Sequence, residues 1–378
     1  METFAAKKIE VEQVEQLLLE CPENIIVQVA PAVRVALGEL FSMPLGQNCQ
    51  GKMITALKKI GFQNVFDTDF GADITIVEEA NEFISKIRHG EKLPMFSSCC
   101  PGWINNALVS FRDVLPQIST TKSPVGCFGS LAKRYFAKKN NVSVDSIYVV
   151  SIVPCLLKKA EAQAAFNKTE DIFDVDFTWT TKDLAILIKE RGIDFSSLEE
   201  SSFDNPLSSS SGGGKIFGKA GGVSQSLIRA LYYYLEKREF TDKITFEVSP
   251  AIAEVQECTL SIASKEYKFA RTNIVGANKI LKEIRAGNCD YSFVEVMACM
   301  GGCVMGAGQP AFNTFPGKTF NDVRIARKEA LEKSDVESEI KCAPMNLDLI
   351  KLYDYLSLQP YSPLAKKYLH RDYSKYGK

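Results

Sequence analysis

The sequence predicts an α/β fold with two lobes of helix-flanked parallel and mixed β-sheets. In the first half of the chain, short apolar runs alternate with helical segments, a pattern typical of parallel sheets covered by helices. In the second half, several short strands follow one another, which indicates more antiparallel pairing. The chain has 378 residues, of which 46% are hydrophobic, and this length suits two lobes better than one small core.

The first lobe is expected to span approximately residues 1–200. Asn24–Ala30 (NIIVQVA) is a β-rich run that ends at Pro31. Gln50–Ile60 has the character of a helix, and Asn64–Asp67 (NVFD) that of a second, short strand. This alternation indicates a parallel sheet with helical connections.

The same alternation continues along the chain. Ile74–Ile87 is expected to be a helix, and Leu93–Ser98 (LPMFSS) a strand of the buried type. Pro101 suits the first turn of the next helix, because the N–H group that proline lacks would have no partner there. Ser146–Val153 (SIYVVSIV) is a continuous apolar strand, and a helix rich in lysine and alanine follows it.

The second lobe is expected at approximately residues 201–345, with a C-terminal extension at 346–378, all in one domain spanning 1–378. Asn205–Lys215 (NPLSSSSGGGK) is predicted to be a linker or mobile loop. The extension is expected to form a helix and a segment that wraps over the surface. A helix is predicted at Val223–Lys237 and strands at Lys243–Val248, Thr259–Ser264, Tyr267–Thr272 and Tyr291–Val296.

The composition argues against several classes of protein. The formal net charge is −1, whereas dedicated nucleic-acid or membrane-surface binders normally carry a strong basic excess. No run approaches the roughly eighteen apolar residues that a membrane span needs. The N-terminal METFAAKKIEVEQVEQLLLE carries charges where a signal peptide needs an apolar region. We therefore expect a soluble, cytoplasmic protein that binds neither nucleic acid nor membranes.

The chain has eleven cysteines but only two histidines, His89 and His370. Disulfides are rare in a reducing cytosol, so the cysteines are expected to be core residues, catalytic groups or metal ligands. With so few histidines, a metal would be bound by thiolates, which favours iron–sulfur chemistry or an all-cysteine zinc site. Six cysteines are scattered singly and are interpreted as core thiols: Cys21, Cys49, Cys127, Cys258, Cys289 and Cys342.

The other five cysteines follow three predicted strands. Cys99 and Cys100 end one strand, Cys155 ends another, and Cys299 and Cys303 follow a third in a glycine-rich loop. Ligands bind at the carboxyl ends of strands in open α/β sheets, and glycines let the backbone approach a bulky cofactor. Four thiolates would suit a cubane cluster, and one thiol is left over. A chance gathering of core cysteines is the alternative.

Three motifs around these cysteines resemble the signature motifs of the [FeFe]-hydrogenase catalytic domain, in the same order and separation. They are SSCCPGW, VPCLLKKAEA and EVMACMGGCVMGAGQP. The resemblance extends from Val29–Glu39 (VAPAVRVALGE) to Gln309-Pro310 and includes GADITIVEEANEF and GKIFGKAGGV. Three motifs of this length are together highly specific.

The resemblance implies an iron hydrogenase that interconverts H2 with protons and electrons. Its cofactor would be an H-cluster: a [4Fe–4S] cubane joined to a two-iron unit with CO, cyanide and azadithiolate ligands, clasped between the two lobes. The implied cubane ligands are Cys100, Cys155, Cys299 and Cys303, with Cys303 as the bridge to the two-iron unit. Lys158 is implied to bind a cyanide ligand, and the implied pocket residues are Ser98, Pro31, Met297 and Gln309.

In the family pattern, Cys99 is the first proton carrier and not a ligand. Glu79, Ser119 and Glu82 would then relay protons to the surface near Lys86. The spacing of Glu79, Glu82 and Lys86 places them on one helix face, for which a solvated, salt-bridged exterior is the alternative. Burial would raise the pKa of such carboxyl groups and suit them to shuttle protons near neutral pH.

Some positions depart from the family pattern. Val125 stands in place of glutamine, Val153 of methionine, Met300 of proline, Ala307 of glycine and Lys86 of arginine. These departures bear on the tuning and rate of the reaction, and they leave the ligand set intact. Lys159, beside Lys158, is expected to be a solvated surface lysine.

The resemblance also implies partners. Only Cys21 and Cys49 precede Cys99, so the chain is expected to be a minimal form without N-terminal ferredoxin-like domains. Electrons would come from an external ferredoxin or flavodoxin docking at a lysine-rich patch, for which the basic tail KKYLHRDYSKYGK is one candidate. Dedicated maturation enzymes would supply the two-iron unit. The alternatives are a non-catalytic iron–sulfur relative, in cluster assembly or H2 sensing, and a structural zinc protein.

Overall fold

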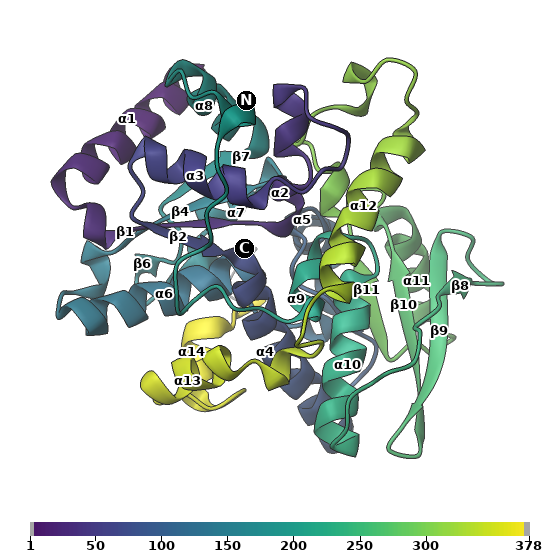
Figure 1. The fold of residues 1–378 in the computed structure, drawn as a ribbon. Coiled ribbons are helices and arrows are strands. Elements are labelled where there is room, and N and C mark those ends of the chain that lie inside the picture. Colours follow the sequence, from purple (N-terminus) through teal and green to yellow (C-terminus); the bar gives the residue numbers. More distant parts are fainter. Residues whose placement is uncertain (1–3, 374–378) are drawn as a thin grey trace.

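The computed structural model describes residues 4–373, and a four-stranded parallel sheet forms the core of its first part (Figure 1). The strand order is β2-β1-β4-β7, and all neighbours run parallel. All five residues of β1 are buried, which explains the unbroken apolar run in the sequence. The strands are β1 (Ile25–Val29), β2 (Asn64–Asp67), β4 (Tyr148–Val153) and β7 (Phe177–Thr180).

A second, mixed sheet has the order β3-β11-β10-β9-β8. Strands β3, β11 and β10 run parallel, whereas β10, β9 and β8 are antiparallel. Its strands are β3 (Met95–Phe96), β8 (Glu247–Val248), β9 (Val255–Ile262), β10 (Lys265–Thr272) and β11 (Phe293–Val296). A small hairpin pairs β5 (Lys168–Thr169) with β6 (Ile172–Phe173). The predicted α/β class with parallel and mixed sheets is therefore confirmed.

Strand β3 matters most for the site, although it has only two residues. The sequence predicted a strand over Leu93–Ser98, but ladder pairing is limited to Met95 and Phe96 opposite Phe293 and Val294. Through this pairing, the chain just before the two adjacent cysteines joins the sheet that also carries the strand before the glycine-rich loop.

Helices cover both sheets. They are α1 (Phe4–Glu20), α2 (Pro31–Arg34), α3 (Gln50–Ile60), α4 (Thr68–His89), α5 (Pro101–Ser110), α6 (Pro124–Asn140), α7 (Leu157–Ala162), α8 (Thr181–Glu190), α9 (Gly212–Lys215), α10 (Gly222–Glu236), α11 (Ile274–Ala286), α12 (Phe320–Val336), α13 (Leu347–Tyr355) and α14 (Pro363–Leu369). Pro101 opens α5, as predicted. No helix between residues 4 and 373 is both long and apolar enough to cross a lipid bilayer.

Helix α4 begins six residues earlier than the predicted Ile74. Asp67 caps it by accepting a hydrogen bond from Asp69 N–H, and Arg34 forms ion pairs with both aspartates. This charge pairing lets a polar first turn be buried, which the sequence pattern alone does not reveal. Helix α4 packs against α6, α9 and α10.

The prediction of a linker or mobile loop at the Ser/Gly tract Asn205–Lys215 is wrong for the second half of the tract, where Gly212–Lys215 forms α9, whereas residues 205–210 form neither helix nor strand. Ser211 is fully buried and caps α9, and its N–H and hydroxyl donate to Asp73 at 2.7 and 2.6 Å. A β-carbon at Gly214 would lie 2.6 Å from the Asp69 carbonyl oxygen. The tract is therefore rich in small residues because its backbone packs directly against α4.

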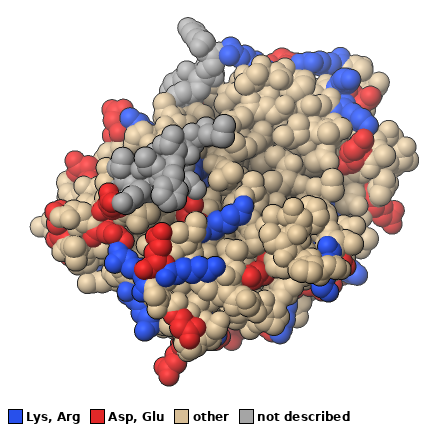
Figure 2. Space-filling view, turned by 90° about the horizontal axis from the view of Figure 1, so that it is seen from above, with Lys and Arg blue, Asp and Glu red and all other residues tan. Residues whose placement is uncertain are grey.

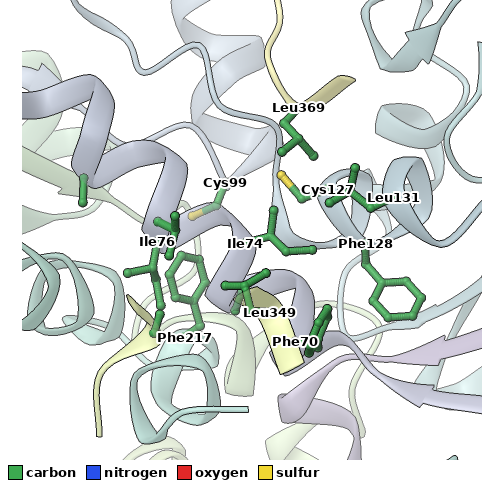
Figure 3. Packing of buried hydrophobic residues seen from close by; sticks show 14 of the residues in the cluster. Phe70, Ile74, Ile76, Cys99, Cys127, Phe128, Leu131, Phe217, Leu349 and Leu369 are labelled. Atoms are coloured by element: carbon green, nitrogen blue, oxygen red, sulfur yellow. The ribbon is translucent and has the colours of Figure 1, made fainter. Parts of the chain in front are cut away.

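The C-terminal extension folds back along the core. Helices α13 and α14 lie beside α4 (Figure 1), and Leu369 joins the apolar cluster around α4 that also contains Cys127 and Leu131 (Figure 3). Lys366 and Lys367 are exposed, but Arg371 is buried. The last five residues of the candidate basic tail, 374–378, lie outside the described part of the chain.

Basic and acidic residues lie close to one another on one face of the molecule. Figure 2 shows acidic and basic residues interspersed, with broad uncharged areas between them. This mixture agrees with the formal net charge of −1.

Candidate cluster-binding site

The three cysteine motifs line one buried cavity. Strands β3, β4 and β11 end at Phe96, Val153 and Val296. The cysteines that follow them all reach a cavity with about 850 Å³ of empty space, part of it continuous with solvent. The lining cysteines are Cys99, Cys100, Cys155, Cys299 and Cys303. As expected for α/β sheets, the carboxyl ends of strands build the site.

Two glycines let the third motif turn back into the cavity. Gly301 and Gly302 have φ angles of +90° and +92°, a conformation that residues with side chains rarely adopt. A β-carbon at Gly302 would also lie 2.5 Å from Ala220 N. Because the loop reverses here, Cys299 and Cys303 face the same space.

The thiols interact electrostatically with one another. Burial raises the pKa of Cys303 well above its ordinary value, and the neighbouring Cys100, Cys155 and Cys299 add to the rise. Burial likewise raises the pKa of Cys299 to about 11, with contributions from Cys155 and Cys100. Each thiol that ionises makes ionisation of its neighbours less favourable. A cationic metal centre would offset this repulsion by binding the thiolates in place of their protons.

The donor set fits an iron–sulfur cluster better than zinc. Within residues 4–373, no three His, Cys, Asp or Glu side chains converge closely enough to hold one metal ion. A tetrahedral zinc site needs such convergence, whereas a cubane spreads its four thiolates around a larger body. The five cysteines in a largely apolar lining and the reversing glycine loop therefore match a cluster.

Lys158 lies at the wall of this cavity. Its ammonium donates a hydrogen bond to the Cys99 carbonyl oxygen at 3.1 Å and pairs with Glu161 at 2.5 Å. Glu161 is also paired with Arg371 at 2.8 Å. The ammonium group is thus held at the wall of the cavity that the thiols line.

The expectation of a solvated Lys159 is wrong. Its side chain is only 11% exposed and lies 3.5 Å from Asp183. Asp183 belongs to the capping box of α8, which also involves Thr180. This contact links α7 to α8, and the local sequence gives no sign of it.

The cysteine next to the first proposed ligand is packed among apolar groups. Cys99 is buried and belongs to the apolar cluster around α4, with Ile76 and Phe217 (Figure 3). Burial raises the pKa of its thiol well above the ordinary value; the charge of Glu79 adds to the rise, and Lys158 opposes it. Cys99 therefore lines the cavity as a protonated thiol, beside a buried carboxyl group.

The acidic face of α4 is not a solvated exterior. Glu79, Glu82 and Lys86 are 2%, 1% and 7% exposed. Burial and the charge of Glu82 raise the pKa of Glu79 to about 8, although a hydrogen bond from Ser119 opposes the rise. Ser119 Oγ also lies 2.8 Å from Glu82 Oε2. The structure thus brings Glu79, Ser119 and Glu82 together inside the protein.

Lys86 lies where this row of residues meets the surface. Its ammonium pairs with Glu91 at 3.0 Å and donates to the Pro116 carbonyl oxygen at 3.3 Å. The Glu91 side chain is 47% exposed. Proton exchange with water is therefore possible at this end.

Of the four residues predicted to line the pocket, two line the cavity and two do not. Pro31 and Met297 line the cavity. Ser98 is buried, but its hydroxyl donates to the Thr121 carbonyl oxygen at 2.5 Å. Gln309 is also buried; its amide donates to Ala32 and accepts from Thr181. The side chains of Ser98 and Gln309 therefore form hydrogen bonds with neighbouring segments instead of lining the cavity.

Sequence reasoning missed several residues of the site. Phe217 and Gly218 line the cavity from far along the chain, and the GKIFGKAGGV segment was the available signal. Thr120 and Thr121 both donate to Glu82; their only signal was adjacency to Ser119. Of the departing positions, Val125 and Val153 line the cavity, whereas Met300 is 66% exposed.

Replacing Glu79 with glutamine should stabilise the folded chain more at pH 9 than at pH 6. The folded-state pKa of about 8 exceeds the ordinary 4.5, so the protonated carboxyl favours folding at low pH. This stabilisation is lost as the pH rises from about 4.5 through 8, and glutamine never ionises. Chemical denaturation should show a gain larger by roughly 2 kcal/mol at pH 9.

The exposed Glu266→Gln variant is the matched control for this experiment. It should change the unfolding free energy equally at both pH values. An equal effect of Glu79→Gln at pH 6 and pH 9 would show that Glu79 ionises normally in the folded chain.

Fold and site together define a class: an α/β protein with five cysteines gathered in one cavity at the carboxyl ends of parallel strands. Residues 23–307 match the family model described as iron only hydrogenase large subunit, C-terminal domain. Residues 321–376 match the iron hydrogenase small subunit model. The chain belongs to the [FeFe]-hydrogenase family and contains its large-subunit catalytic domain.

Individual relatives agree with this assignment. The chain is 39% identical over 305 residues to the periplasmic [Fe] hydrogenase large subunit of Nitratidesulfovibrio vulgaris, covering 79% of this chain and 72% of that one. It is 34% identical over 373 residues to iron hydrogenase 1 of Clostridium pasteurianum, covering 98% and 64%. The chain therefore spans about two thirds of the length of these relatives.

The fold is similar to that of a solved hydrogenase. A variant of the [FeFe]-hydrogenase HydA1 from Chlamydomonas reinhardtii matches with a TM-score of 0.84 and 29% identity, covering 96% of this chain and 98% of that one. A second branch of relatives also matches: Protein NAR1 of Arabidopsis thaliana is 31% identical, with 93% of this chain and 78% of the relative covered.

Proposed function

We propose that this chain is an active hydrogenase, which reversibly interconverts H2 with protons and electrons at an H-cluster. The observation that supports this most is the fifth thiol. Cys99 lines the same cavity as the four proposed ligands and interacts with the buried carboxyl of Glu79. A protein that only stored a cluster would have no use for a protonated thiol joined to buried carboxyl groups.

The proposed ligands of the cubane are Cys100, Cys155, Cys299 and Cys303, with Cys303 as the bridge to the two-iron unit. When bound, this cofactor supplies the redox-active metal centre at which H2 is formed or split. Lys158 would hold an anionic ligand of the cofactor, since its ammonium already lies at the cavity wall.

The proposed proton route uses residues of this chain alone. Cys99 exchanges a proton at the cavity, and Glu79 takes it up. Ser119 connects Glu79 to Glu82 through its hydroxyl, which lies 2.8 Å from Glu82. Lys86 marks the outer end of the route, beside the exposed Glu91. A carboxyl whose pKa is near 8 is suited to carry protons in both directions near neutral pH.

Electrons are proposed to enter at a second hollow. This hollow is lined by Cys299 and Met300 and is bordered by Lys243, Arg324 and Lys328. Since Met300 is 66% exposed, a docked partner would come close to the cluster. The hollow is lined by five basic residues and three glutamates, and this basic excess suits an acidic redox partner, for which we propose a ferredoxin or flavodoxin. Dedicated maturation enzymes are proposed to supply the two-iron unit.

The rival is a non-catalytic iron–sulfur protein for cluster assembly or H2 sensing, a possibility raised by the likeness to Protein NAR1. Such a protein needs neither Cys99 nor Lys158, and both line the cavity here.

The function is tested by H2 production from a reduced dye. Anaerobically purified chain that carries the cubane and has been matured with a two-iron precursor should evolve H2. The same chain with the cubane alone should not. A matured sample that contains both metal units and neither evolves nor consumes H2 would contradict the proposal.

A further inference from the structure

Partly buried hydrogen bonds join Glu82 to the C-terminal extension. Thr120 Oγ1 lies 3.0 Å from Glu82 Oε1 and 2.8 Å from His370 Nδ1. His370 Nε2 in turn lies 2.9 Å from Glu78 Oε2. Glu78 is fully buried, and the His370 side chain is only 5% exposed. Glu78 and the His370 imidazole are therefore shielded from bulk water, whereas Thr120 is half-buried.

The contact with Glu78 fixes the role of one imidazole nitrogen. Glu78 also accepts hydrogen bonds from the Tyr353 hydroxyl at 2.6 Å and from Tyr361 N–H at 2.8 Å. Because the Glu78 oxygens already accept these two hydrogen bonds, we assign His370 Nε2 as a further donor to Glu78, which leaves Nδ1 facing Thr120.

Thr120 links the state of Nδ1 to Glu82. Its hydroxyl has one proton to donate. If His370 Nδ1 carries a proton, Nδ1 donates to Thr120 and the hydroxyl donates to Glu82. If Nδ1 is bare, the hydroxyl turns to His370, and Glu82 keeps only its other donors, which include Ser119 and Thr121.

Backbone pairing holds His370 against the same segment that carries Ser119. Arg371 N–H donates to the Thr120 carbonyl oxygen at 2.7 Å, and Lys122 N–H donates to the Leu369 carbonyl oxygen at 2.8 Å. Thr121 and His370 form an antiparallel bridge. The geometry is thus set by main-chain contacts on both sides of the histidine.

Helix α4 and the C-terminal extension both contribute titratable groups near the imidazole of His370. The Tyr361 ring lies 5.4 Å from the imidazole ring, and the Lys366 ammonium lies over the Tyr361 ring. Arg371 pairs with Glu161 instead. The groups that face His370 or its link to Glu82 are Glu78 and Glu82 from α4, and Tyr353, Tyr361, Lys366 and Tyr373 from the extension.

We propose that His370 is a positioning residue that holds one proton on a side branch of the hydrogenase proton route, joined to it at Glu82 through Thr120. This inference rests on the proposed function. Each H2 molecule involves two protons, and the main route would transfer them one after the other. A branch that stores one proton leaves Glu82 ready for the next.

The transfer balances without any further reactant. Protonated Glu82 gives its proton to Thr120 Oγ1, while Thr120 passes its hydroxyl proton to His370 Nδ1. Glu82 becomes a carboxylate, His370 becomes an imidazolium, and the total charge is unchanged. The new cation lies 2.9 Å from Glu78, which stabilises it. The reverse transfer returns the proton to the route.

Imidazole ¹⁵N NMR of the full chain tests the branch directly. The protein has only two histidines, so His89→Gln assigns the His370 signals. Glu82→Gln should move the pH at which these signals change downward by at least about half a unit, because the hydrogen bonds from His370 Nδ1–H through the Thr120 hydroxyl then end on a neutral amide instead of a carboxylate. Thr120→Val, which breaks this link, should reduce the response to the small through-space effect of the lost charge, whereas Thr120→Ser, which keeps the hydroxyl, should retain it in full.

Identical His370 titration in wild type and Glu82→Gln would overturn the proposal, and so would a response to Glu82→Gln that is undiminished in Thr120→Val. The NMR experiment needs no two-iron unit. If the His370 signals respond to Glu82→Gln through Thr120 but the matured chain never evolves H2, the proposed function is contradicted. The link between Glu82 and His370 is then still supported.

In active enzyme, the pH profile supplies a second readout. His370→Gln and Thr120→Val should lose H2 production more steeply than wild type as the pH rises, since protons are then scarce. Thr120→Ser should follow the wild-type profile. Rates that fall by the same factor at every pH would indicate a merely structural role and would overturn the branch.

Discussion

Cys99→Ala should abolish most hydrogen turnover while the metal cluster stays in place. Cys99 lines the cavity, and no other thiol there remains once four cysteines are committed to the cubane. Its loss leaves a gap between the cavity and the buried carboxyl of Glu79, with which the thiol interacts. Positioned proton transfer contributes about 10²- to 10⁴-fold to a rate, so a loss of at least about a hundredfold is expected in dye-driven H2 production.

Cys127→Ala is the matched control. Cys127 is fully buried in the same apolar cluster as Cys99 and does not line the cavity. It should keep its iron and most of its activity. If Cys99→Ala loses the cubane iron instead, Cys99 is a ligand and the division of labour between the two adjacent cysteines is wrong.

Cys155→Ala should lose the cubane itself. The second motif contributes a single cysteine, so no neighbouring thiol can replace it. By contrast, Cys99 lies next to Cys100 and could substitute for it in a Cys100 variant. Anaerobically reconstituted Cys155→Ala should therefore bind less cluster iron than wild type by more than about tenfold. The expected signature is loss of the visible absorption of the cluster.

The same Cys127→Ala control applies to this experiment. A chain that keeps full cluster iron without Cys155 would show that the ligand set lies elsewhere. Burial raises the pKa of the Cys155 thiol, and the nearby Lys158 lowers it. The variant therefore also tests whether a thiolate beside Lys158 is needed to bind the cluster.

The strand ends could be predicted from the sequence because buried parallel strands are continuous apolar runs. β1 and β4 are of this kind, and the carboxyl ends of such strands form the site. The pairing of β3 with β11 could not be predicted, since two residues carry too little pattern. It is nevertheless this pairing that brings Cys100 and Cys299 to one cavity.

Long-range packing explains the other failures. Glu79 and Glu82 have the spacing of a solvated helix face, and only the tertiary structure shows that they are buried. Thr120 and His370 are 250 residues apart in sequence, so no local pattern links them. The Ser/Gly tract was misread because small residues serve close backbone packing as well as flexible linkers.

Infrared spectroscopy tests the central claim most directly. The claim is that the five-cysteine cavity holds a cubane joined to a two-iron unit and leaves Cys99 free. Chain that carries the cubane and is incubated with a two-iron precursor should show bands of metal-bound CO and cyanide, and Lys158→Ala should shift the cyanide bands. Absence of both sets of bands from cubane-loaded protein would contradict the account.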